Sequence, residues 1–270
     1  MKDKVLKMRK YLKVFILFKK INFVERVAYR LGFFLMTSAV FLQLFFNLFF
    51  IKIIFGWVEN IHGWNYHEAL LVVGTVLLLD GMMWVSFAFV HILGQHIKMG
   101  MLDSLIIKPM DCQFLVSVYR GDLEDAVRII TGLGVMIFAL SGLGSFGWGF
   151  LLNIFWYLIL VFNAFVIIYS IAIMLTSIKF WTIESGGFHV ADTVVRVSQY
   201  PTDIFSGKII HFIFSFIFPL AFIATVPAKI LAHGFQWQLV GQSFLIAIIF
   251  FWLARKVWKL GLSKYSSASS

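Results

Sequence analysis

Long apolar stretches, separated by short polar segments, occupy most of this chain. They cover residues 31–55, 69–93, 126–143, 150–175, 209–226 and 239–257. Each has about 18–26 residues, and a helix rising 1.5 Å per residue needs that length to cross a hydrocarbon core of roughly 30 Å. The pattern predicts an all-α, polytopic membrane protein with six transmembrane helices.

The basic residues are distributed unequally around these stretches. Alternate crossing would place two sets of segments on opposite sides: 1–30, 94–125, 176–208 and 258–270 on one, and 56–68, 144–149 and 227–238 on the other. Of the 23 Lys and Arg, all except Lys52 and Lys229 fall in the first set or just inside the adjoining helix ends. Because basic loops stay in the cytoplasm, both termini are predicted to be cytoplasmic. We expect the plasma membrane, as in a bacterial inner membrane.

The segment 1–30 differs from the apolar stretches because lysines interrupt it. Its apolar positions recur at helical spacing, at Val5, Met8, Leu12, Phe15 and Phe18. A basic amphipathic helix of this kind lies in the headgroup plane. The domain organisation predicted is an elbow segment (1–30), a six-helix transmembrane domain (31–258) and a cytoplasmic tail (259–270). The elbow segment either anchors the protein to the surface or moves with the first span.

Composition agrees with a membrane location. Hydrophobic residues make up 61% and charged residues 13%, against about 45–50% and 25% in soluble domains. The net charge of +10 suits the anionic inner leaflet, which attracts basic side chains near the surface. We therefore expect membrane lipid as a partner and no nucleic acid.

The sequence lacks the common catalytic and metal-binding motifs. It has no G-x-x-x-x-G-K-[ST] phosphate loop, no G-x-S-x-G elbow and no H-E-x-x-H helix. Cys112 is the single cysteine, and His62 and His67 are spaced poorly for one helix face. The sequence predicts no catalytic residue, no metal site and no cofactor on this chain, and the protein is not expected to be an enzyme.

The segment after the second apolar stretch has the pattern of a short helix. Gly100 is expected to end the preceding helix and Pro109 to end the short one. Leu102, Leu105 and Ile106 would form an apolar stripe that needs a covering partner. We predict a contact with an energy-supplying subunit through Lys98, Gly100, Leu102, Asp103, Leu105, Ile106, Lys108 and Pro109. The alternative is an ordinary interfacial helix turn.

A second cytoplasmic contact is predicted after the fourth apolar stretch. Residues between Phe188 and Gln199 have one apolar and one polar helical face. Pro201 would separate this interfacial helix from the fifth span. The residues predicted to make the contact are Trp181, Val194, Tyr200, Pro201 and Phe205.

Asp80 lies near the middle of the second apolar stretch. An uncompensated charge there costs at least about 2.5–3.5 kcal/mol. Asp80 is therefore protonated, paired inside the bundle, or exposed to a water-filled cavity. It either lines a translocation path or serves as a buried hydrogen-bond anchor.

Several short motifs resemble the membrane permeases of type-two ABC exporters. They are the segment from Gly100 to Pro109, Phe180-Trp181-Thr182, the segment from Tyr200 to Phe205, Tyr29-Arg30, Gly63-Trp64, and the pattern from Pro219 to Pro227. The resemblance implies a six-helix permease that pairs with a second, identical or paralogous permease. It also implies separate ABC ATPase subunits, which bind ATP and Mg and drive export of a substrate. The alternatives are an ion-coupled secondary transporter using Asp80 and a membrane scaffold that transports nothing.

Overall fold

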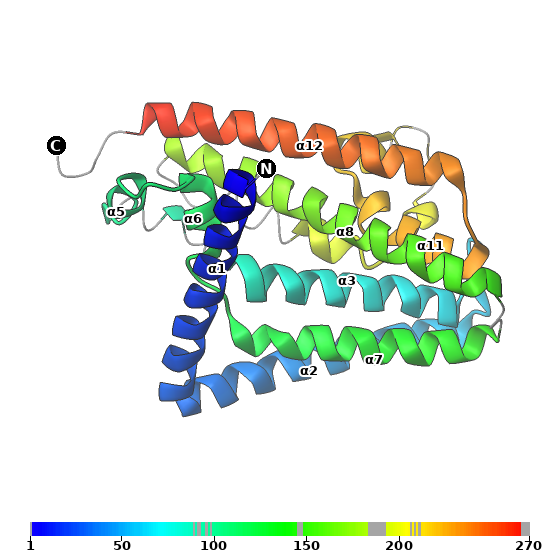
Figure 1. The fold of residues 1–270 in the computed structure, drawn as a ribbon. Coiled ribbons are helices and arrows are strands. Elements are labelled where there is room, and N and C mark those ends of the chain that lie inside the picture. Colours follow the sequence, from blue (N-terminus) through cyan, green and yellow to red (C-terminus); the bar gives the residue numbers. More distant parts are fainter. Residues whose placement is uncertain are drawn as a thin grey trace.

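Five long apolar helices lie side by side in one bundle (Figure 1). They are α2 (Arg30–Trp57), α3 (Tyr66–Phe87), α7 (Ala126–Leu143), α8 (Trp148–Ser177) and α12 (Trp237–Lys264). The computed structural model describes residues 2–88, 90, 93–94, 97, 99–144, 148–182, 193–205, 207, 209 and 212–265. All five helices are long and apolar enough to cross a membrane. The predicted all-α, polytopic membrane protein is confirmed at this level.

The bundle has two ends, which we call the basic end and the hairpin end. At the basic end α2 and α7 begin and α12 finishes; at the hairpin end lie Trp57, Leu143 and Trp237. A two-stranded hairpin of β1 (Asn60–Ile61) and β2 (Trp64–Asn65) joins α2 to α3. Its turn needs positive φ, which His62 (50°) and Gly63 (84°) adopt.

Small residues let α3 and α7 approach each other closely. A Cβ atom added to Gly132 would lie 2.8 Å from the carbonyl oxygen of Gly74, and one added to Gly81 would lie 2.7 Å from Ile129. Such contacts favour small residues where two membrane helices cross. The packing fixes the relative position of the polar groups that α3 and α7 carry.

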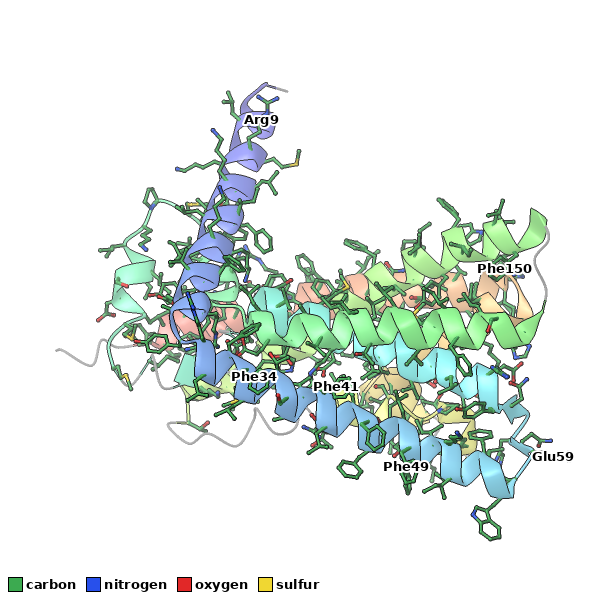
Figure 2. The ribbon with its side chains drawn as sticks, turned by 90° about the horizontal axis from the view of Figure 1, so that it is seen from below. Arg9, Phe34, Phe41, Phe49, Glu59 and Phe150 are labelled. Carbon is green, nitrogen blue, oxygen red and sulfur yellow. The ribbon has the colours of Figure 1, made fainter. Side chains whose placement is uncertain are left out.

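Helix α1 (Lys2–Ala28) runs across the basic end instead of along the bundle (Figure 1). One non-helical residue, Tyr29, separates it from α2. Most large side chains of α2 are exposed, and Phe34, Phe41 and Phe49 follow its outer side in Figure 2. The sequence correctly predicted a helix before the first span.

Short elements complete the two ends of the bundle. The described short elements are α5 (Asp103–Ile106), α6 (Cys112–Val118), η1 (Leu123–Asp125), η2 (Ile178–Phe180), η3 (Thr202–Ile204), η4 (Ile213–Ile217), η5 (Ala221–Thr225) and α11 (Val226–His233). At the far end of the chain, α12 continues to Lys264, beyond the predicted end of the span at 257.

The fifth apolar stretch does not form the single straight helix predicted for 209–226. The turn η4 stops before Phe218, which is extended, and the chain resumes as η5 and α11 after Pro219. Proline has no N–H to donate and its ring displaces the preceding turn, so the helix breaks here. The prediction of one continuous span at this position is wrong.

Trp181 and Asp203 lie at opposite ends of the bundle, and we call the described residues 193–203 the crossing segment. At the basic end, Phe180 packs against Trp258 and Tyr265 of the α12 segment. At the hairpin end, Asp203 accepts hydrogen bonds from Trp64 and Lys229, at 3.2 and 2.9 Å. The described residues around Asp203 therefore lie at the hairpin end, which corrects the prediction that all of 176–208 lies on the basic side. Within this stretch the described residues 193–197 are helical.

Candidate functional site

The segment 99–118 extends from the basic end of the bundle as a compact loop (Figure 1). Gly100 adopts a φ of 68°, a left-handed conformation that glycine accepts without strain. One helical turn, α5, and then α6 follow this reversal. The predicted short helix between Gly100 and Pro109 is present, while Lys98 lies outside the described residues.

The apolar residues of this loop divide between the interior and the solvent. Leu102 and Leu105 are 0% and 2% exposed and belong to the protein's own core. They cannot fill a partner's cleft as predicted, because their three-residue spacing places both on the inner face of the turn. The apolar side chains left exposed on this loop include Met99, Ile106 and Ile107, with Ile107 83% exposed. Lys108 and Pro109 beside them are also exposed.

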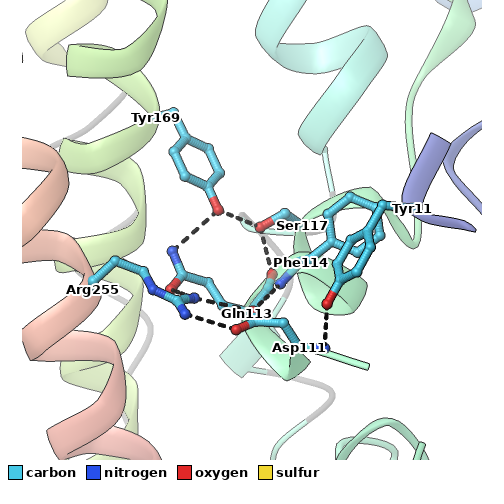
Figure 3. A network of polar contacts seen from close by, with 7 residues as sticks. All are labelled: Tyr11, Asp111, Gln113, Phe114, Ser117, Tyr169 and Arg255. Atoms are coloured by element: carbon cyan, nitrogen blue, oxygen red, sulfur yellow. Dashed lines mark hydrogen bonds and ion pairs between the residues drawn. The ribbon is translucent and has the colours of Figure 1, made fainter. Parts of the chain in front are cut away.

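Asp111 and Arg255 hold the base of the loop against α12 (Figure 3). The Arg255 guanidinium donates to both Asp111 oxygens, at 3.0 and 2.7 Å, and to Gln113 Oε1 at 2.8 Å. Asp111 also caps α6 by accepting from the Phe114 amide at 3.0 Å. Burial alone would raise the pKa of Asp111, but these hydrogen bonds outweigh it and hold the pKa below its usual range.

The same cluster joins α6 to α8 and α1. Gln113 Nε2 donates to the Tyr169 hydroxyl at 3.2 Å, and Ser117 shares a 2.8 Å hydrogen bond with that hydroxyl. The Asp111 amide donates to the Tyr11 hydroxyl at 3.3 Å, and the Tyr11 ring meets Phe114 edge-on (Figure 3). The loop is thus fixed to three helices, and its movement would displace all of them.

A line of charges leads from α1 into the bundle. Arg26 pairs with Asp122 and Glu124. Further in, Arg128 pairs with Asp125 at 2.6 Å and with Asp80 at 3.1 Å, and it donates to Gln43 at 3.1 Å. Of the three states that the sequence allowed for Asp80, the structure shows pairing inside the bundle.

Asp80 and Arg128 also line a polar cavity of about 430 Å³. Its walls come from α2, α3, α7 and the crossing segment: Gln43, Asn47, Val76, Leu77, Asp80, Trp84, Arg128, Val195, Arg196 and Gln199. Asn47 donates to Gln199 across it at 3.5 Å. Asp80 lies about 21 Å along α3 from Tyr66, so the cavity is within membrane depth. Pairing and a polar cavity together explain how a carboxylate is retained there.

Comparison of the sequence with known protein families identifies the family of this chain. The sequence profile described as ABC-2 family transporter protein matches residues 41–269. The chain belongs to the ABC-2 family. The match runs from the first half of α2 past the end of α12, and so includes the loop, the cluster around Asp111 and the cavity. Searches of curated proteins and of solved structures gave no match.

The second predicted contact of this ABC-2 permease is not one site. Trp181 lies at the basic end and is 48% exposed, whereas Val194 is buried in the crossing segment. Tyr200, Pro201 and Phe205 flank Asp203 at the hairpin end, where the Thr202 amide donates to Thr225. The sequence hid this because Arg196 and Gln199, which line the cavity, give this segment the composition of a polar loop.

The residues that sequence reasoning missed in the ABC-2 permease are Asp111, Gln113, Tyr169, Arg128 and Arg255. Asp111 and Arg255 are 144 residues apart, so no local period relates them. A weak signal existed, because an arginine near the end of an apolar stretch needs a partner. The identity of that partner followed only from the packing of α6 against α12.

We expect Cys112 to react slowly with thiol reagents. Burial, aided by the nearby Asp111 carboxylate, raises the pKa of the Cys112 thiol from 9.0 to about 11. Because the thiolate is the nucleophile, the labelling rate near pH 7.5 should be about a hundredfold below that of a thiol with pKa 9, and should rise about tenfold per pH unit up to pH 11. Maleimide labelling of the detergent-purified protein between pH 7 and 9 measures this, with an introduced Ser263→Cys as the exposed control. A rate equal to that of the control would contradict it.

Proposed function

We propose that this ABC-2 permease is the membrane subunit of an ABC exporter. Two permease chains form the membrane part, and separate ATPase subunits bind ATP and Mg and supply the energy. The basic end faces the cytoplasm and carries both chain termini, in a plasma membrane such as a bacterial inner membrane. The crossing segment that ends at Asp203 completes a six-pass topology with α2, α3, α7, α8 and α12.

The exposed loop at the basic end carries the proposal. Its apolar residues Met99, Ile106 and Ile107 are exposed, and Lys108 on the same loop is exposed as well. The hydrogen bonds of Asp111 and Arg255 fix its base to α12. An apolar surface that is fixed to α12 can transmit a partner's conformational change to the transmembrane helices. Since the sequence contains no phosphate loop, an ATP-driven exporter built on this chain needs a separate ATPase, and the loop offers the surface for it.

The cavity supports the pairing of two permeases. Arg196 lines it and is exposed on the single chain, seven residues before the hairpin end at Asp203. Polar and charged groups at membrane depth are found where they face a bundle interior or a water-filled cavity. A second permease across this face would cover the exposed Arg196 side chain and enclose a polar path between the chains. Asp80 and Arg128 would then form part of the path wall.

Affinity purification in mild detergent from the native membrane tests the proposal. We expect a chain with a phosphate loop to co-elute in a 1:1 ratio with the permease, and the complex to hydrolyse ATP. Its mass should correspond to two permease chains. An ion-coupled transporter or a scaffold would purify without an ATPase, and that result would overturn the proposal. A complex with a single permease chain would overturn the pairing alone.

A further inference from the structure

A second cavity lies where α1 joins α2, outside the cluster around Asp111 and the polar cavity. It has a volume of about 420 Å³, within the usual range of about 300–1,000 Å³ for ligand sites. Its lining residues come from the end of α1, the start of α2, η1 and the first residue of α7: Phe23, Arg26, Arg30, Phe33, Leu123 and Ala126. We call it the elbow pocket.

The elbow pocket combines apolar walls with cationic groups. The Phe23, Phe33 and Leu123 side chains provide an apolar surface, and two guanidinium groups contribute to the same lining. Arg26 is held by Asp122 and Glu124. Arg30 is exposed, and within the described part of the chain it makes no ion pair. The available positive charge is therefore that of Arg30.

The position of the elbow pocket selects the occupant. Helix α1 runs across the basic end while α2 begins the bundle there (Figure 1), so the corner between them lies at the level of lipid headgroups. Basic side chains at that level attract anionic lipids by about 1 kcal/mol each. An apolar pocket with a free guanidinium at this depth complements a molecule with a hydrocarbon chain and a phosphate.

We propose that the elbow pocket binds an anionic phospholipid, with an acyl chain between Phe23 and Phe33 and the phosphate on Arg30. The site is independent of the transport function proposed above, because it uses neither the loop at 99–118 nor the polar cavity. The bound lipid would fix the angle between α1 and α2, since it contacts both helices.

Lipid retention in the purified complex tests this. The complex is equilibrated in equal amounts of phosphatidylglycerol and phosphatidylcholine, extracted in mild detergent, and its retained lipid is counted by native mass spectrometry. We expect phosphatidylglycerol to be enriched, and Arg30→Gln to lower the enrichment about fivefold, which corresponds to about 1 kcal/mol. Arg9→Gln, at the far end of α1 (Figure 2), should leave the enrichment unchanged. Equal losses in the two variants would reduce the effect to general surface charge and overturn the site.

A second pair of variants tests whether the apolar wall of the elbow pocket holds the acyl chain. Phe33 lines the elbow pocket, while its neighbour Phe34 does not line it and is 67% exposed. Phe33→Ala should reduce the number of retained lipids, and Phe34→Ala should not. A phosphatidylglycerol with a diazirine on its acyl chain should label the peptides around Phe23 and Phe33. Labelling found only elsewhere, or a Phe33→Ala variant with full lipid retention, would overturn the proposal.

Discussion

Replacing Arg128 by glutamine should remove a large part of the stability of the permease. Arg128 pairs with Asp80 and Asp125, and the Asp80 and Asp125 side chains are only 15% and 10% exposed. Removing one partner of a buried ion pair costs about 3–5 kcal/mol, because the remaining charge is left without compensation. Against a typical total of about 5–15 kcal/mol, that loss is large. We expect little monodisperse protein and a strongly lowered midpoint in a thermal-shift measurement.

Arg120→Gln is the matched control for this experiment. Its side chain is 48% exposed and pairs with Asp122 at 3.3 Å, and exposed pairs contribute about 0–1 kcal/mol. Combining Arg128→Gln with Asp80→Asn should recover part of the stability, since the amide needs no counter-charge. Asp80→Asn alone should assemble, because Arg128 keeps Asp125. If Asp80→Asn assembles but does not transport substrate, the negative charge of Asp80 is required for transport along the proposed path. Equal midpoints for Arg128→Gln and Arg120→Gln would refute the pairing argument.

Replacing Ile107 by aspartate should release the ATPase while leaving the permease folded. Ile107 is 83% exposed on the loop, so the substitution places a carboxylate in solvent until the partner binds. Docking would then bury an unpaired charge against an apolar surface. Truncating an anchor in such an interface costs about 2 kcal/mol or more, equivalent to at least roughly thirtyfold in affinity. The ratio of ATPase to permease after purification, with the thermal midpoint of the permease, measures both effects.

Two further aspartate variants separate docking from folding. Leu105→Asp places the carboxylate in the protein's own core, since Leu105 is 2% exposed, and it should lower the midpoint of the permease itself. Leu260→Asp changes an exposed residue of α12 outside the loop and should keep both the midpoint and the ATPase. An Ile107→Asp complex with its full complement of ATPase would show that this loop is not the contact.

The sequence determined that this is a helical membrane protein, and it predicted the helix α1 and the helix end at Gly100. Stretches such as 150–175 are apolar on every side, and only a membrane accommodates helices of that length and hydropathy. The helical spacing of apolar residues before residue 30 predicted α1, and Gly100 predicted a helix end before α5. These features follow from local periodicity and from the conformational range of single residues, which are properties of the chain itself.

The tertiary structure decided which polar residues meet and which leucines are covered. Asp80 became an ion pair only because the packing of α3 on α7 brings Arg128 to it, and Asp111 meets Arg255 across 144 residues. The same packing buried Leu102 and Leu105 and left Ile107 exposed. It also placed Arg196 and Gln199 on a shared cavity, although their segment has the composition of a polar loop. Hydropathy averages each segment alone, whereas these outcomes depend on what the neighbouring helices present.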